Sequence, residues 1–183
     1  MTRLHFLKES LKNLMTIGTV TRSSAILCKQ MIREVDFTNG TDFVELGAGD
    51  GVVTKHMLKR MRPNARVFAF EVNETFCDKL RAINDDRLIV LQRDATDLIN
   101  IMAEHNVTKV DGIISAIPFV LLEDEQTERI IEQSKEMMKP NTQFVQIHYS
   151  LILKKLYERL FRNVSVQFVP INVPPAFVFR CWD

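Results

Sequence analysis

Apolar and polar positions change their rhythm near residue 42 of the 183-residue chain. From there on, short apolar runs alternate with stretches whose apolar residues recur every three or four positions, patterns typical of buried strands and amphipathic helices. Strands are predicted at 43–46, 66–71, 88–91, 110–115 and 144–149, and helices at 52–61, 73–82, 98–104, 123–139 and 151–161. Two last strands, at 164–169 and 176–182, have no helix between them and form an antiparallel hairpin around Pro174 and Pro175. We therefore predict an α/β fold, a doubly wound, seven-stranded and mostly parallel sheet whose last strand is antiparallel.

The first 34 residues follow a different pattern. Apolar side chains recur at helical spacing between residues 4 and 15, with Lys8 and Lys12 along one edge of the stripe and Arg3 along the other. A second helix is predicted at 25–34, after a serine that can cap it. Residues 1–33 hold six basic residues and one acidic residue, so the rest of the chain is net acidic. We therefore divide the chain into a basic amphipathic arm with a loop at 1–34 and a main domain at 35–183.

The arm has three candidate partners. Leu7 and Leu11, bordered by Lys8 and Lys12, form an apolar stripe with a cationic edge, which suits the surface of a membrane that contains anionic lipid. The same helix could pack on its own domain with its lysines at the rim. RNA is the rival partner, because its phosphates attract the same cations.

The composition excludes several classes of protein. Charged residues make up 26% of the chain and the net charge is +1, which argues against a generically basic nucleic-acid binder. No apolar run reaches about 18 residues, and the N-terminus lacks the pattern of a secretory signal. We therefore expect a cytoplasmic protein with neither a disulfide framework nor a metal site. The residues that such sites would need lie far apart, at Cys28, Cys77, Cys181, His5, His56, His105 and His148.

The strongest chemical motif is the segment Glu45-Leu46-Gly47-Ala48-Gly49-Asp50-Gly51, between the strand at 43–46 and the next helix. Its glycines let the backbone turn tightly and approach a ligand closely. The spacing G-x-G-x-G differs from the G-x-G-x-x-G of a dinucleotide site, and no Lys-Ser or Lys-Thr pair follows as in a P-loop. The motif alone could be a simple tight connection.

Two acidic residues follow the next two strands. Glu71 stands twenty residues past Gly51, where a carboxylate can accept hydrogen bonds from both ribose hydroxyls of a nucleoside. Asp94 follows the third strand, where it can bind an exocyclic amine, and the amide of Ala95 can meet a ring nitrogen. These positions share the carboxyl edge of the predicted sheet, so together they predict a nucleoside site that requires no pyrophosphate.

The order and spacing of these residues resemble the first three motifs of the class I S-adenosylmethionine-dependent methyltransferases, a Rossmann-like fold. The resemblance covers about residues 40–183. It implies that Gly47, Gly49 and Gly51 pass the methionine part of the cofactor, Glu71 holds the ribose, and Asp94 with Ala95 holds the adenine. We also expect other residues to line this cofactor site, with a loop of the arm covering it: Glu45, Ala48, Val72 and Ser115, and Gly18 and Thr19 in the loop.

The segment Ser115-Ala116-Ile117-Pro118-Phe119 follows the fourth strand, where such enzymes choose the methyl acceptor. Enzymes that methylate the amino groups of bases commonly carry Asn or Asp two places before the Pro-aromatic pair, to bind the target amine. Ala116 occupies that place here. Pro118 and Phe119 remain candidates for acceptor contacts, although Phe119 could equally belong to the core.

A narrower resemblance spans nearly the whole chain. The loop at 17–24, the Ser115–Pro118 segment, Gln146-Ile147-His148-Tyr149 and Asn172-Val173-Pro174-Pro175-Ala176 are similar to motifs of the short bacterial phosphatidylethanolamine N-methyltransferases. This resemblance implies an enzyme on the inner face of the cell membrane, acting on a phospholipid headgroup. We expect the protein to be a monomer. The alternatives are an rRNA adenine N6-methyltransferase-like enzyme and a cofactor-binding module without turnover.

Two residues at the end of the fifth strand are candidates for catalysis. His148 and Tyr149 point to opposite faces of an extended strand, so we expect only one to face the site. The Tyr149 ring can hold a methylated ammonium group by cation–π attraction, which also makes it a substrate-binding candidate. His148 is the alternative proton acceptor.

Overall fold

The structure is a computed structural model, and it describes residues 24–183. The strands are β1 (Asp42–Leu46), β2 (Arg66–Phe70), β3 (Leu88–Leu91), β4 (Gly112–Ser115), β5 (Phe144–His148), β6 (Asn163–Val169) and β7 (Ala176–Trp182). The helices are α2 (Ala25–Met31), α3 (Val52–Leu58), α4 (Glu74–Arg81), α5 (Leu98–Glu104), α6 (Asp124–Met137) and α7 (Lys154–Leu160), with short 3-10 helices η1 (Ala95–Asp97) and η2 (Phe119–Leu121). The predicted arm helix and the residues Leu7, Leu11, Lys8, Lys12, Gly18 and Thr19 lie outside the described residues.

The seven strands form one sheet in the order β3-β2-β1-β4-β5-β7-β6. β1 is parallel to β2 and β4, and β4 is parallel to β5, whereas β7 runs antiparallel to both β5 and β6. This arrangement confirms the predicted fold, including the reversed last strand. Since β5 runs toward the carboxyl edge of the sheet and β7 runs away from it, the turn between β6 and β7 lies at that carboxyl edge.

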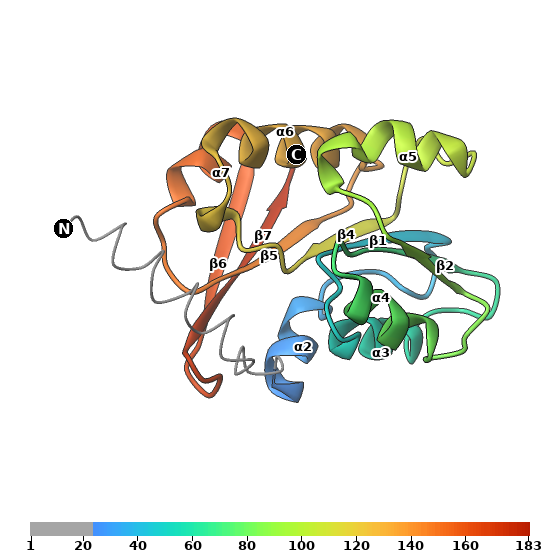
Figure 1. Cartoon of the computed structure of the whole chain (residues 1–183). Coiled ribbons are helices and arrows are strands. Elements are labelled where there is room, and N and C mark those ends of the chain that lie inside the picture. The colour runs from blue at the N-terminus through green and yellow to red at the C-terminus, as the bar shows by residue number, and fades with distance from the viewer. Residues whose placement is uncertain (1–23) are drawn as a thin grey trace.

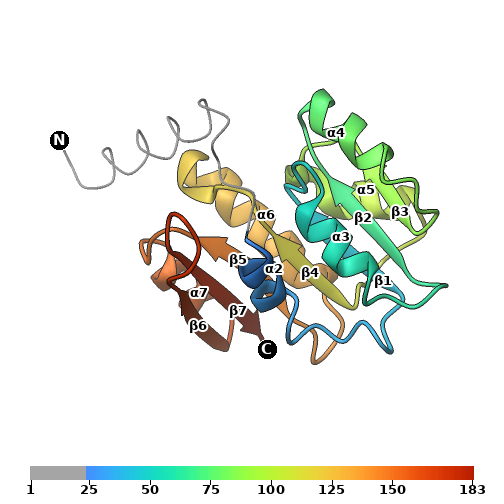
Figure 2. The same cartoon turned by 90° about the horizontal axis from the view of Figure 1, so that it is seen from below.

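Helices cover both faces of the sheet, as expected for strands that are apolar on both sides. α5, α6 and α7 lie on one face, and α2, α3 and α4 lie on the other (Figure 1). On the first face the core includes Phe68, Phe144 and Phe179, packed against side chains of the three helices. α2 packs beside α3 and against β5 and β7 (Figure 2), where Leu27 and Met31 are fully buried.

Several element ends differ from the sequence prediction. β5 ends at His148, so Tyr149 lies just beyond the strand, and α7 begins at Lys154 instead of residue 151. The residues between them form a loop in which Leu151 and Ile152 are exposed. α2 ends at Met31, three residues earlier than predicted. None of the helices in residues 24–183 is long and apolar enough to cross a bilayer.

The turn between β6 and β7 is fixed to the start of α2. Asn172 is 1% exposed; its side-chain amide donates to the carbonyl oxygen of Pro174 at 2.8 Å. Its Oδ1 accepts a hydrogen bond from the backbone amide of Ser24 at 3.1 Å. Ser24 is also the N-cap of α2, because its hydroxyl accepts from the amide of Leu27 at 3.2 Å. One buried side chain therefore links the hairpin to the first described residue of the chain.

Candidate active site

The glycine-rich turn after β1 requires its glycines. Gly47, Gly49 and Gly51 have φ angles of +70°, +56° and +80°, a region that other L-residues adopt at a steric cost. A Cβ on Gly51 would also lie 2.8 Å from a side-chain atom of Ile83. The amides of Gly47 and Ala48 both donate to the carbonyl oxygen of Phe70, at 2.9 and 3.1 Å, and this holds the turn against the end of β2.

Glu71, directly after β2, fastens the middle of this turn. One carboxylate oxygen accepts from the amide of Gly49 at 2.8 Å, and the other accepts from the amide of Asn73 at 2.9 Å. Glu71 is 9% exposed. Each oxygen of an ionised carboxylate can accept a further hydrogen bond, so Glu71 can hold the turn and still accept hydrogen bonds from a diol.

Asp94 lies three residues beyond the end of β3 and directly before η1. Its Oδ1 accepts from the amide of Thr96 at 2.7 Å, which makes it the N-cap of that short helix. Ala95 is the first residue of η1, and amides in that position have no acceptor within the helix. Val72 is 65% exposed, beside Glu71. Glu71 follows β2, and Asp94 and Ala95 follow β3, so the predicted ribose and adenine residues lie beyond the carboxyl ends of two adjacent strands.

Glu45 has a different place from that of the other predicted cofactor residues. It is buried within β1, and the hydroxyl of Thr54 on α3 donates to its carboxyl group at 2.6 Å. The pKa of Glu45 is raised to about 8, mainly by burial and also by the nearby charge of Glu71, against the opposing effect of the Thr54 hydrogen bond. Glu45 is thus mainly protonated at neutral pH and braces the start of α3 from inside the molecule. Thr54 was not found by sequence reasoning, because no motif points to it.

The segment after β4 is anchored by β5. Ser115 is fully buried, and its hydroxyl accepts weakly from the amide of Ile117 at 3.4 Å. Gln146 donates to the carbonyl oxygen of Ile117 at 2.9 Å, so the loop that leads to Pro118 is tied to the neighbouring strand. The sequence contains Gln146 in a motif, but its anchoring role depends on the pairing of β4 with β5, which a motif does not reveal.

Phe119 lies in the core. It is 1% exposed, its carbonyl oxygen accepts from the hydroxyl of Thr127 at 3.1 Å, and its ring packs 6.4 Å from the ring of His148. Of the two alternatives for Phe119, the structure supports packing within the core. Pro118, one residue earlier, is half-buried and begins η2. Pro118 is therefore the residue of this pair that remains near the surface.

His148 and Tyr149 lie on opposite faces of the sheet, as the strand alternation predicts. His148 is 4% exposed and packs among aromatic rings on the face covered by α6 and α7. Its Nε2 lies 2.9 Å from the hydroxyl of Tyr157, and burial lowers the pKa of His148 to about 4. Tyr149 is half-buried against the cluster on the α2 and α3 face, and burial raises the pKa of its phenol. A buried imidazole that stays neutral is poorly placed to receive a proton from a substrate, so the structure favours Tyr149 over His148 at the site.

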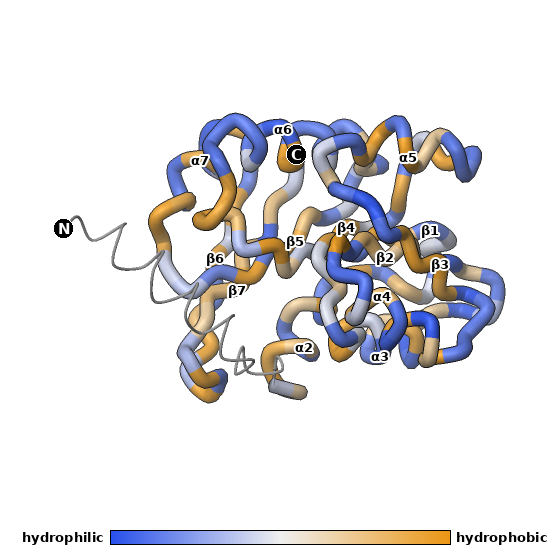
Figure 3. Tube along the Cα trace, in the orientation of Figure 1, coloured by the Kyte–Doolittle hydropathy of each residue, from blue (hydrophilic) through white to orange (hydrophobic). Residues whose placement is uncertain are grey.

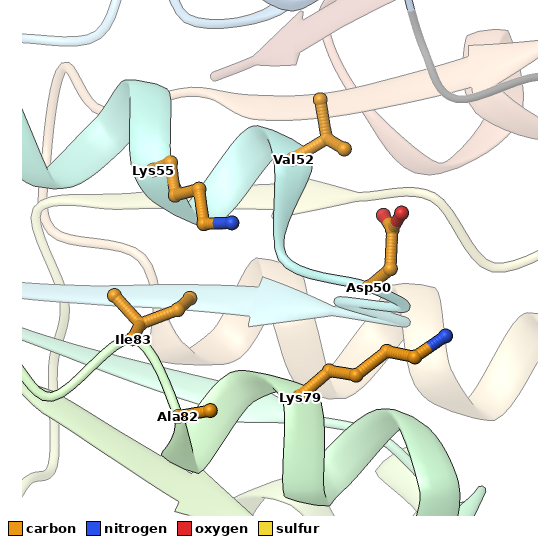
Figure 4. A pocket seen from close by; sticks show the side chains of 6 residues that line it. All are labelled: Asp50, Val52, Lys55, Lys79, Ala82 and Ile83. Atoms are coloured by element: carbon orange, nitrogen blue, oxygen red, sulfur yellow. The ribbon is translucent and has the colours of Figure 1, made fainter.

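An open groove of about 590 Å³ lies beside the turn, between α3 and α4 (Figure 4). Its lining residues are Asp50, Val52, Lys55, Lys79, Ala82 and Ile83. None of them belongs to the predicted cofactor contacts, so the groove is not assigned to the cofactor. Within residues 24–183, no group of histidine, cysteine and acidic side chains is arranged to hold a metal ion.

The reversed β7, the strand order and the glycine turn after β1 together define a Rossmann-like, class I S-adenosylmethionine-dependent methyltransferase. The chain belongs to the family described as a methyltransferase domain, whose profile matches residues 43–141. It is therefore an enzyme of the transferase class that uses S-adenosylmethionine.

Individual relatives agree with this assignment. The chain is 29% identical over 179 residues to an ornithine lipid N-methyltransferase from Singulisphaera acidiphila, and the match covers 96% of this chain and 93% of that protein. Among solved structures, the chain resembles a precorrin-6y C5,15-methyltransferase from Geobacter metallireducens, with a TM-score of 0.66, 14% identity, and coverage of 86% of this chain and 88% of that chain. It also resembles a methyltransferase from Geobacter sulfurreducens, with a TM-score of 0.63, 13% identity, and coverage of 99% and 90%. The structural matches, at 14% and 13% identity, support the fold alone.

Proposed function

We propose that this protein transfers a methyl group from S-adenosylmethionine to the headgroup amine of phosphatidylethanolamine at a membrane surface. The observation that carries the proposal is the match along 96% of the chain to an enzyme that methylates nitrogen in a lipid. The Asn172–Ala176 segment and the Ser115–Pro118 segment support phosphatidylethanolamine as the lipid, through their similarity to enzymes of that specificity.

In this proposal the carboxyl edge of β1, β2 and β3 holds the cofactor. Gly47, Gly49 and Gly51 leave room for its methionine part, and Glu71 accepts hydrogen bonds from the ribose hydroxyls with its remaining lone pairs. Asp94 and the amide of Ala95 bind the adenine edge. The remaining predicted contacts are Ala48, Val72 and Ser115, and Gly18 and Thr19 in the arm; Glu45 acts from beneath the turn.

S-adenosylmethionine supplies a methyl group on a positively charged sulfur, which an amine can displace directly. The protein's main contribution is to hold the amine in line with that methyl group. Such positioning can lower the activation barrier by several kcal/mol, and by about 7 to 11 kcal/mol in the best-oriented cases. An ammonium headgroup has no free electron pair, so it must lose a proton before it reacts. Because the phenol of Tyr149 has a raised pKa, it is neutral at pH 7. We assign to it the binding of the cationic headgroup through its ring, while the proton leaves to water.

The arm supports a membrane location for this reaction. In the helix predicted from the sequence, Leu7 and Leu11 would form an apolar stripe and Lys8 and Lys12 its cationic edge. Each lysine near an anionic surface would contribute about 1 kcal/mol of binding. We propose that the arm brings the enzyme to the inner face of the cell membrane. No residue in the described chain is proposed as a metal ligand.

The test uses the purified full chain, radiolabelled S-adenosylmethionine and vesicles that contain phosphatidylethanolamine. Parallel samples contain ornithine lipid in place of phosphatidylethanolamine, or RNA. We expect label in monomethylated and dimethylated phosphatidylethanolamine, separated by chromatography. Label in ornithine lipid alone would keep the lipid class and reject phosphatidylethanolamine. Label in RNA adenine, or cofactor binding without label in any acceptor, would reject the proposal.

A further inference from the structure

Five of the eight exposed large apolar side chains in residues 24–183 lie in two loops or, for Phe168, near the end of β6 next to one of them. One loop connects β5 to α7, and the other is the turn between β6 and β7. We call these five residues the apolar tip: Leu151, Ile152, Phe168, Ile171 and Val173. Ile171 and Val173 are the most exposed, at 67% and 71%. Apolar segments at the β6–β7 turn and before α7 are visible in Figure 3.

Strand pairing brings the two loops together. His148, the last residue of β5, pairs with Phe177 of β7, and Phe177 pairs in turn with Phe168 of β6. The rings of Phe168 and Phe177 lie 5.1 Å apart. The chain therefore leaves β5 and β6, and enters β7, at the same edge of three adjacent strands.

The charges around the apolar tip are as unevenly placed as the apolar residues. No Asp, Glu, Lys or Arg occurs at 140–153 or at 163–179. Two exposed lysines, Lys154 and Lys155, then begin α7 immediately after the first loop. An uncharged apolar surface with cations at its rim matches the interface of a bilayer, where apolar side chains enter the acyl boundary and lysines remain among the phosphates. RNA would need cations across the surface itself.

The turn between β6 and β7 also carries few polar groups that would lose water in lipid. Three of its residues are prolines and have no amide hydrogen: Pro170, Pro174 and Pro175. Asn172 satisfies the carbonyl oxygen of Pro174 from within the fold. Unsatisfied backbone groups are costly in hydrocarbon, so this turn loses less on insertion than an ordinary loop would.

We infer that the apolar tip inserts into the lipid surface and forms a membrane contact separate from the arm. The inference rests on the proposed function for the identity of the lipid that is delivered. The tip lies at the carboxyl edge of the sheet, the edge that also carries the glycine turn and Tyr149. A bilayer bound there would present its headgroups to the edge at which the cofactor binds.

The test places a fluorescent reporter in the tip. Ile171→Trp is compared with Phe76→Trp, an exposed apolar position on α4, after subtraction of the Trp182 signal of the unchanged protein. The vesicles contain phosphatidylethanolamine and phosphatidylglycerol with brominated acyl chains. We expect quenching and a blue shift for Ile171→Trp and no change for Phe76→Trp. Equal quenching of the two, or none at position 171 while the protein cosediments with vesicles, would overturn the inference.

A charged variant connects the contact to turnover. Ile171→Asp should reduce methylation of phosphatidylethanolamine in vesicles about tenfold or more, the effect of about 1.4 kcal/mol of binding, and leave methylation of a soluble short-chain phosphatidylethanolamine unchanged. Phe76→Asp should change neither rate. Equal loss on both substrates would overturn the inference. So would a dimer in solution that Ile171→Asp converts to a monomer, because a second copy would then cover the tip.

The two proposals fail separately. Insertion at position 171 without methylation of any lipid would reject the proposed function and keep the membrane contact. Methylation of the short-chain lipid without insertion would keep the function and reject the contact. Blue-shifted emission from Ile171→Trp before vesicles are added would show the tip covered by protein and would also reject the contact.

Discussion

The carboxylate of Glu71 and the amide of Gly49 are joined by a hydrogen bond of 2.8 Å that closes the glycine turn onto the end of β2. The residue expected to hold the ribose thus also shapes the turn expected to hold the methionine part. Both donors that reach Glu71 are backbone amides, so the site depends on a side chain that only accepts.

Glu71→Gln tests this double role. The amide nitrogen of glutamine would face a backbone amide and leave at least one donor without an acceptor. We expect the affinity for S-adenosylmethionine, measured by calorimetry, to fall by a factor of about 10 to 100, equivalent to about 1.4 to 2.7 kcal/mol. The free energy of unfolding should also fall, by about 1 to 3 kcal/mol. Unchanged affinity would remove Glu71 from the cofactor site.

Asp94 can be separated into its two roles by a pair of variants. Asp94→Ala removes both the cap of η1 and the proposed adenine contact, whereas Asp94→Asn keeps an oxygen that can cap the Thr96 amide. We expect Asp94→Ala to weaken cofactor binding about tenfold or more. Asp94→Asn should change the stability of the fold little but still weaken cofactor binding, since a neutral amide is a poorer acceptor than a carboxylate. Equal affinities for all three proteins would contradict the assignment.

Tyr149 is tested by the contrast between Phe and Ala. If the ring holds the headgroup, Tyr149→Phe should keep kcat and KM within a factor of about 3, whereas Tyr149→Ala should raise KM about tenfold, near the upper range of one cation–π contact. Initial rates over a range of phosphatidylethanolamine concentrations separate the two constants. A large fall in kcat for Phe would show instead that the hydroxyl takes part in the chemistry.

The buried pair of His148 and Tyr157 predicts a pH dependence of stability. The pKa of His148 is about 4 in the folded chain and near 6.5 when unfolded. The unfolded chain binds more protons between these values, so the stability contributed by neutral His148 is complete above about pH 6.5 and is lost as the pH falls toward 4. His148→Phe should remove this part of the slope in urea unfolding between pH 7 and pH 5. Tyr157→Phe should keep the slope of unfolding free energy against pH. If His148→Phe keeps this slope as well, His148 is not the group responsible for it.

Glu45 predicts a pH dependence of stability with the opposite sign to that of His148. Its folded pKa of about 8 lies above the unfolded value of about 4.5, so its contribution is complete below pH 4.5 and is lost as the pH rises through 8. Glutamine resembles the protonated carboxyl group and does not ionise. The stability of Glu45→Gln relative to the unchanged protein should therefore increase from pH 5 to pH 8, by more than about 1 kcal/mol. A constant difference would mean that Glu45 is ionised in the folded protein.

The sequence predicts those parts of the fold that depend on short, local segments of the chain. The strand and helix periods and the three glycines of the turn act locally, so their positions were correct to within a few residues at most ends. The burial of His148 was not predictable, because it depends on Tyr157 from α7 and Phe179 from β7, which only the folded chain brings beside it. The sequence does not decide between the core and the acceptor site for Phe119 for the same reason, since the motif around Phe119 does not show what its side chain packs against.

The hydrogen bond between Ser24 and Asn172 would set the geometry of the membrane attachment proposed above. Residues 1–23 join the described part of the chain at Ser24, which is held to the turn that carries the apolar tip. If both proposals hold, the arm would be tethered beside the second contact, and the two would act as a bivalent ligand with a high effective concentration for each other. Salt should weaken the cationic arm more than the uncharged tip. Dissociation from the membrane would therefore require both contacts to release together, and the enzyme could methylate several headgroups in one residence on the surface.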